Sequence, residues 1–96
     1  MRLIDKENFI SLTLKIPLKA YSTNATSCLE MLEAFLKSGL YEFTLRFERD
    51  TKKFQATAFS YEDLYSTMLN GNDFKIVVVE EIYRFLQKRK EMGRTV

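Results

Sequence analysis

The segment YEFTLRFERDTKKFQATAF, residues 41–59, constrains the fold most, because both of its sides agree on one antiparallel hairpin. Apolar residues would face each other on one side: Phe43 and Ala58, Leu45 and Ala56, Phe47 and Phe54. Polar residues would pair on the other: Thr44 and Thr57, Arg46 and Gln55, Glu48 and Lys53. The last pair has opposite charges, which supports a register. The tip at Asp50-Thr51 lacks the glycine of a tight two-residue turn, and a loop over residues 49–52 would keep the same pairing.

Residues 21–40, YSTNATSCLEMLEAFLKSGL, change to a helical period. Apolar residues recur with helical spacing at Cys28, Leu32, Phe35 and Leu36, and Gly39 lies where helices commonly stop. These features predict a helix that ends near Ser38 and begins at one of several possible caps.

Residues 74–90, FKIVVVEEIYRFLQKRK, are open to two interpretations. FKIVVV has the composition of a strand. Asn72 or Asp73, however, is placed to cap a helix that begins at Phe74. One helical face would carry Phe74, Val78, Ile82, Phe85 and Leu86. We predict a helix over residues 74–91, with a strand over 74–79 as the alternative.

Two further elements complete the predicted fold. Residues 9–19 alternate between apolar and polar, which predicts a half-buried strand, and Pro17 places that strand at a sheet edge. Ser60 and Asp63 followed by Leu64 and Met68 predict a short helix that stops at Asn70-Gly71. The expected fold is α+β: one domain over residues 1–96, with a three-stranded antiparallel sheet and helices packed on one face, in the order β-α-β-β-α-α. The first strand would pair with the third, giving the strand order 2-3-1.

Composition and charge exclude several classes of protein. The 96 residues are 46% hydrophobic and carry a formal net charge of +2, which describes a folded chain without a strong field of its own. No apolar run approaches the ~20 residues that span a bilayer, so no membrane role is expected. Cys28 is the only cysteine, which fits a reducing compartment. We therefore expect a soluble cytoplasmic protein.

The sequence offers little for catalysis. It has no histidine and one cysteine, so the commonest general base and a structural zinc site are both missing. Cys28 falls on an apolar helical stripe and is interpreted as a core residue. Glu80 and Glu81 diverge on a helix, and Glu30 and Glu33 lie on a solvent face. We expect no enzyme, no catalytic residues, no cofactor and no metal.

The tyrosines favour a binding function. Several lie at element ends or beside helical stripes, where they would be partly exposed, and aromatic residues of this kind form the centres of protein interfaces. The candidate partner-binding residues are Tyr41, Tyr61, Tyr65 and Tyr83. The leading hypothesis is a small accessory, regulatory or inhibitory protein-binding factor, of a size that fits a bacterium or a phage. Homodimer formation through the edge strand at residues 9–19 is a further option.

The alternative hypothesis is a nucleic-acid-binding module. Its candidate residues are Arg84, Lys88, Arg89, Lys90 and Arg94, set against one acid, Glu91. Such a cluster could follow a phosphate backbone. It could equally be the cationic end that helices acquire to complement the backbone dipole. The sequence leaves both explanations open.

Overall fold

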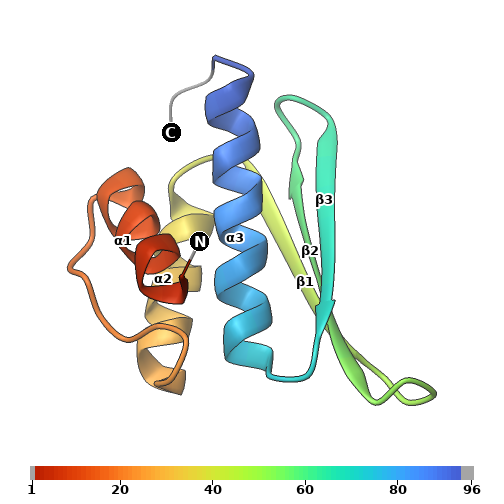
Figure 1. Ribbon diagram of the computed structural model, residues 1–96. Helices are drawn as coiled ribbons and strands as arrows, with labels where there is room; N and C mark the ends of the chain where they lie inside the picture. Colours follow the sequence, from red (N-terminus) through yellow and green to blue (C-terminus); the bar gives the residue numbers. More distant parts are fainter. Residues whose placement is uncertain (1, 94–96) are drawn as a thin grey trace.

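The computed structural model describes residues 2–93, and for Tyr65 the backbone alone. Within that range the chain is an α+β fold in the order α-α-β-β-β-α. The helices are α1 (Leu3–Leu14), α2 (Ala25–Lys37) and α3 (Phe74–Glu91). The strands are β1 (Tyr41–Glu48), β2 (Lys53–Ser60) and β3 (Tyr65–Gly71), and they form an antiparallel sheet in the order β1-β2-β3. Figure 1 shows all three helices on one side of the sheet, with α3 nearest to it.

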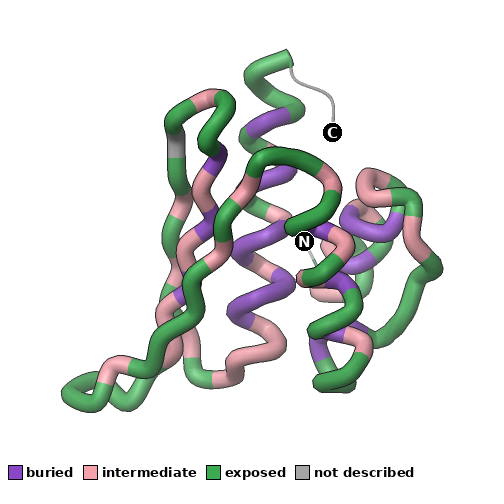
Figure 2. The backbone as a smooth tube through the Cα atoms, turned by 180° about the vertical axis from the view of Figure 1, so that it is seen from behind, coloured by how far each residue is buried: buried purple, intermediate pink, exposed green. Residues whose placement is uncertain are grey.

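The hairpin prediction is confirmed. β1 and β2 pair in the predicted register, with Phe43 opposite Ala58 and Glu48 opposite Lys53. The connection covers residues 49–52, and Lys52 has a φ of 57°, a left-handed conformation that closes the loop. Figures 1 and 2 show that the tip of this hairpin projects beyond the helices and is exposed.

The two longer helices also form where the sequence predicts them. The side chain of Asn24 caps α2 by accepting a hydrogen bond from the amide of Ser27 at 2.9 Å. Asp73 caps α3 by accepting from the amides of Lys75 and Ile76 at 2.9 and 3.3 Å. Because α3 is helical from Phe74 onward, the alternative of a strand over residues 74–79 is wrong.

The predicted edge strand over residues 9–19 is also wrong. Its first half belongs to α1, whose C-cap is Lys15 (φ 58°), with Pro17 two residues beyond that cap. The alternating pattern would bury Ile10 and Leu12 on one face, but the helix buries Ile10 and leaves Leu12 exposed. Packing on α3 decides the outcome, because the ring of Phe9 contacts that of Tyr83 with centroids 5.3 Å apart.

A buried carboxylate secures α1 to the chain that follows it. Glu7 is almost completely buried, and its Oε2 accepts hydrogen bonds from the amide and the hydroxyl of Ser22 at 2.8 and 2.9 Å. These bonds join the helix to the segment just before α2.

The predicted helix over residues 60–71 is wrong as well, since most of that segment is β3. The Ser60–Asp63 pattern makes a turn instead of a cap: the amide of Asp63 donates to the hydroxyl of Ser60 at 3.1 Å, and Leu64 takes a φ of 55°. Gly71 ends β3 beneath α3, where an added Cβ would lie 2.5 Å from Val77. The sheet is therefore a simple meander, and its two edges are β1 and β3.

The core lies between α3 and the other helices, and between α3 and the sheet. Phe35 of α2 and Phe85 of α3 pack edge to face with centroids 5.3 Å apart, among Met31, Ile82 and Leu86. Figure 2 shows buried segments along α3, with others on α1, α2 and the inner strand. Among the helices of residues 2–93, none is long and apolar enough to cross a membrane.

Candidate protein-interaction site

The structure does not gather the candidate tyrosines on one surface. Tyr41 packs inward, stacked on Phe35 with centroids 4.9 Å apart, and burial raises its pKa. Tyr83 is half-buried against Phe9, between α3 and α1. Tyr61 is exposed just beyond β2, where the centroids of its ring and the Phe59 ring lie 4.8 Å apart. The side chain of Tyr65 lies outside the described residues.

Tyr61 belongs to the side of the sheet that carries no helix. Its hydroxyl donates to the carboxylate of Glu42 in β1. That bond raises the pKa of Tyr61, because ionising the phenol would place two negative charges together. Tyr61 is thus the one exposed tyrosine among those whose side chains are described.

The basic residues of α3 are divided among different roles. Arg89 is buried in an ion pair with Asp63, with side chains only 5% and 3% exposed, and its guanidinium lies 5.1 Å from the centre of the Tyr41 ring. The ammonium of Lys90 lies 5.7 Å from the centre of the Phe9 ring. Arg94 lies outside the described residues. Arg89 therefore holds the fold together and is not presented to a ligand.

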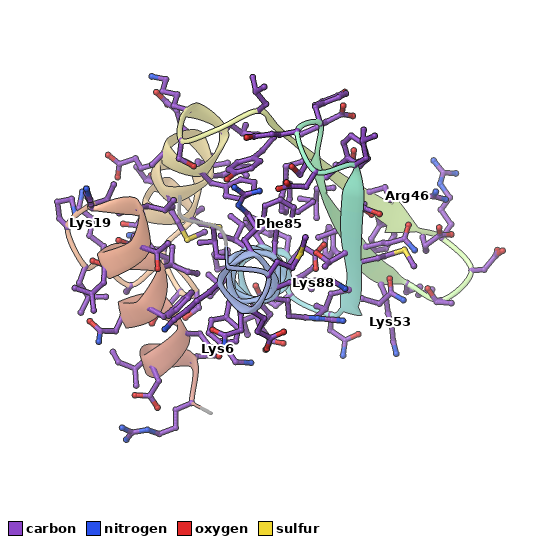
Figure 3. The ribbon with its side chains drawn as sticks, turned by 90° about the horizontal axis from the view of Figure 1, so that it is seen from above. Lys6, Lys19, Arg46, Lys53, Phe85 and Lys88 are labelled. Carbon is purple, nitrogen blue, oxygen red and sulfur yellow. The ribbon has the colours of Figure 1, made fainter. Side chains whose placement is uncertain are left out.

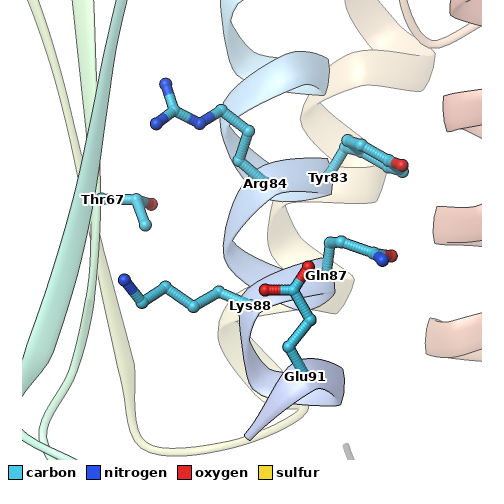
Figure 4. Close-up of a pocket in the computed structure, with 6 residues that line it drawn as sticks. All are labelled: Thr67, Tyr83, Arg84, Gln87, Lys88 and Glu91. Atoms are coloured by element: carbon cyan, nitrogen blue, oxygen red, sulfur yellow. The ribbon is translucent and has the colours of Figure 1, made fainter. Parts of the chain in front are cut away.

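Arg84 and Lys88 line a shallow hollow between α3 and β3 (Figure 4). The other lining residues are Thr67, Tyr83, Gln87 and Glu91. Figure 4 shows both cationic side chains directed toward β3. Nη1 of Arg84 donates to the backbone carbonyl of Met68 at 3.2 Å. The charge of Arg84 therefore serves the junction of helix and sheet.

The contact with Met68 protects one edge of the sheet. The amide of Tyr61 donates to the carbonyl of Leu40 at 2.9 Å, which makes these two opposed residues a hydrogen-bonded pair. Because such pairs alternate along an antiparallel ladder, residue 57 of β2 bonds to β1, and the backbone of Met68 points outward from β3. Arg84 thus satisfies an outward carbonyl of β3, and charged cover of this kind discourages pairing with another strand.

The β1 edge has no comparable cover. By the same alternation, the outward backbone groups of β1 are those of Tyr41, Phe43, Leu45 and Phe47. Apart from pairs internal to strands, no described residue donates to or accepts from these groups. A row of unpaired amides and carbonyls is a template for another strand.

Exposed apolar side chains accompany this edge. Phe35 of α2 packs on Tyr41 and Phe43 in the first half of β1. Farther along, Leu45 and Phe47 are 40% and 51% exposed although they lie on the helix side of the sheet. Figure 3 shows Arg46 at the side of the sheet far from Phe85. We define the β1 edge surface as the outward backbone of β1 with the side chains of Glu42, Thr44, Leu45, Arg46 and Phe47.

Sequence reasoning missed this surface and also the burial of one acid. Glu81 is fully buried: its Oε2 accepts from the amide of Ala58 at 2.9 Å and from the hydroxyl of Thr67 at 2.8 Å. Burial raises the pKa of Glu81, while those hydrogen bonds oppose the rise. Its spacing from Val77, Val78 and Phe85 puts it on the core face, a signal that was available in the sequence. The neighbouring Glu80, in contrast to the buried Glu81, forms an ion pair with Lys6, with Oε2 and Nζ 3.8 Å apart.

Cys28 is buried as expected, and burial raises the pKa of its thiol to about 11. Within residues 2–93, no three acidic or cysteine side chains are grouped in a way that could hold a metal ion. Comparisons with protein-family models, curated proteins and solved structures find no match to this chain. The β1 edge surface is therefore defined by its geometry alone.

Proposed function

We propose that this chain is a small non-enzymatic binding protein that acts as an accessory, regulatory or inhibitory factor by holding another polypeptide at the β1 edge surface. The observation that supports the proposal is the open edge beside Leu45 and Phe47. Backbone groups that have no hydrogen-bond partner among residues 2–93 lie there next to apolar side chains that the helices leave uncovered.

Addition of a strand explains how such a surface would bind. Main-chain hydrogen bonds supply affinity when an extended segment joins a sheet, and alternate side chains supply specificity. A segment beside β1 would place apolar residues against Leu45 and Phe47 on one face. On the other face it would meet the charges of Glu42 and Arg46.

The same proposal accounts for the basic end of α3 without nucleic acid. Arg89 is used by Asp63 and Arg84 by the edge of β3, so the cations do not form one exposed row. A module that binds phosphates relies on several free cations, and its affinity falls steeply with salt.

Affinity capture tests the proposal. The tagged chain would be incubated with lysate of its source cell at two salt concentrations, with and without nuclease. We expect a protein partner that survives both treatments and is lost when Leu45→Asp or Phe47→Asp adds a charge to the surface. Met68→Asp is the matched control, because Met68 lies on the other edge strand and is 54% exposed, close to the value for Phe47.

Two outcomes would contradict the proposal. One is a partner that the Leu45→Asp and Phe47→Asp variants still capture although Met68→Asp does not. The other is recovery of nucleic acid alone, removed by salt, which would favour the basic residues of α3 instead. Circular dichroism of each variant would establish that it is folded.

A further inference from the structure

We propose that a second copy of this chain binds the β1 edge surface, with the two β1 strands antiparallel and centred on Thr44, so that the two sheets become one. The inference rests on the proposed function, because it names an occupant for the same surface. Three features support it: the direction of the backbone, the pattern of charge and the distribution of uncovered apolar side chains.

The backbone restricts which registers are available. A two-fold axis perpendicular to the sheet keeps the helices of both copies on the same side. Odd-numbered residues of β1 must then face odd-numbered residues, and even must face even. The outward groups of Tyr41, Phe43, Leu45 and Phe47 belong to the odd set, so every such register pairs them with one another.

Charge selects one of the registers that pair at least five residues of β1; centring on Phe47 would also oppose Arg46 to Glu48, but it would pair only residues 46–48. Centring on Thr44 places Glu42 opposite Arg46 of the second copy. Because of the two-fold symmetry, this pair of opposite charges forms twice in the dimer. Centring on Leu45 opposes Glu42 to Glu48, and centring on Arg46 opposes that residue to itself; both put like charges together. Centring on Phe43 makes no charge pair within the strand. In the monomer, the one ion pair that Arg46 forms among the described residues is with Glu48, at 2.5 Å, with side chains 60% and 34% exposed, and surface pairs of this kind are easily exchanged.

The apolar side of the strand agrees with that register. Phe43 comes opposite Leu45 of the second copy, and Tyr41 opposite Phe47. The half of β1 that α2 covers in one copy thus lies beside the half that is uncovered in the other. The exposed faces of Leu45 and Phe47 would be buried against aromatic rings that are already fixed by Phe35.

A disulfide crosslink tests the register directly. In a Cys28→Ser background, Thr44→Cys would place two thiols at the two-fold axis. This is a pair without backbone hydrogen bonds, whose Cα atoms lie about 4.5 Å apart, within the range of a disulfide. Arg46→Cys is the matched control on the same strand face, since symmetry separates its two thiols by four residues, roughly 13 Å. With glutathione disulfide as the oxidant, which takes up the two hydrogens, we expect a covalent dimer from the first variant only.

Exchange of charge provides a second test. Arg46→Glu opposes two carboxylates twice in the dimer, and we expect about a tenfold or greater loss of dimer affinity. The double variant Glu42→Arg with Arg46→Glu reverses both charges and should restore affinity. Arg49→Glu, just beyond the paired segment, should leave it unchanged. Sedimentation equilibrium distinguishes the 11.3 kDa monomer from a species of twice that mass.

The outcomes separate this inference from the proposed function. A wild-type chain that stays monomeric at every concentration overturns the inference, as does crosslinking of Thr44→Cys no faster than Arg46→Cys. If the monomeric wild-type chain still captures a protein that the Leu45→Asp variant fails to capture, the proposed function stands. If the dimer shows the predicted crosslink and rescue while no other protein is captured, the inference stands and the accessory function fails.

Discussion

At the scale of single residues, buried polar groups determine how this small fold responds to pH. Glu81 extends from α3 to the sheet, where the amide of Ala58 in β2 and the hydroxyl of Thr67 in β3 both donate to its Oε2. Its Oε1 is buried and has no hydrogen-bond partner among the described residues. Burial favours the neutral form of such a carboxyl, and its pKa is accordingly raised above the usual 4.5.

We predict that Glu81 makes the protein less stable as pH rises. The folded-state pKa is raised, so the contribution of this group to stability is fully present below the ordinary value of 4.5 and is lost as pH rises through the folded-state pKa. Glu81→Gln should abolish that loss. Urea unfolding of both proteins from about pH 4 to 8 measures the difference in the free energy of unfolding.

The matched control for this series is Glu33→Gln. Lys37 lowers the pKa of Glu33 through a hydrogen bond, so this exposed group acts with the opposite sign: its contribution is lost as pH falls. The control should therefore keep the wild-type decline at higher pH. Parallel curves for wild type and Glu81→Gln would show that Glu81 does not titrate differently in the folded state.

Cys28 should react slowly while the chain is folded. With a pKa of about 11, only about a thousandth of the thiol is ionised at about pH 8, and burial also blocks access. We expect modification by Ellman's reagent to be slow in buffer and fast in denaturant. In a Cys28→Ser background, the exposed thiol of Thr51→Cys at the hairpin tip is the comparison, and equal rates for the two thiols in buffer would disprove the buried placement of Cys28.

At the scale of elements, the basic residues of α3 have different roles, and single substitutions should distinguish these roles by their effect on the free energy of unfolding. Arg89→Gln removes the cation that forms the buried ion pair with Asp63 and should lower the free energy of unfolding by about 3–5 kcal/mol. The exposed Lys90 provides the control, since Lys90→Gln should change it by less than about 0.5 kcal/mol. Urea denaturation measures both, and similar losses would contradict the assigned roles. A variant that neutralises all of these cations together would lose the Arg89–Asp63 ion pair and with it stability. A loss of nucleic-acid binding in that variant would therefore not by itself identify a binding surface.

The elements that the sequence predicts are those whose local pattern agrees with their tertiary surroundings. The β1–β2 hairpin has matching pairs on both faces, and Asn24 and Asp73 cap the helices α2 and α3. For α1 and β3 the local pattern conflicts with the packing. Alternation around Ile10 suggested a strand, but contact between Phe9 and Tyr83 holds a helix there. Tertiary context overrides weak local preference in such segments.

The candidate site was missed for a related reason. Whether β1 is an open edge depends on which other segments form strands, and the sequence assigned one strand to residues 9–19 and none to residues 65–71. The partner of Arg89 is Asp63, distant along the chain, so no local pattern reveals its burial. The core position of Glu81, in contrast, could be derived from helical spacing alone.

At the scale of the whole molecule, the helical layer is narrower than the sheet. The helices pack over β2, β3 and the first half of β1, while the end of the hairpin extends past them (Figures 1 and 3). The two edges are consequently unequal, because Arg84 guards β3 and no described side chain guards the backbone of β1. This asymmetry directs any addition of a strand to one side of the molecule.

If a second copy occupies that side, thermal stability must depend on protein concentration. Only folded chains can form the dimer. Each tenfold rise in protein concentration above the dissociation constant of the dimer therefore raises the free energy of unfolding by roughly 0.7 kcal/mol per protomer. For a domain of this size, that corresponds to an increase in Tm of about 3–5 °C. Calorimetry should show this increase for wild type and for the double variant Glu42→Arg with Arg46→Glu, and a constant Tm for Arg46→Glu alone. A wild-type Tm that does not change with concentration would mean that folding and self-association are not coupled, and β1 would then be open to a strand of another protein.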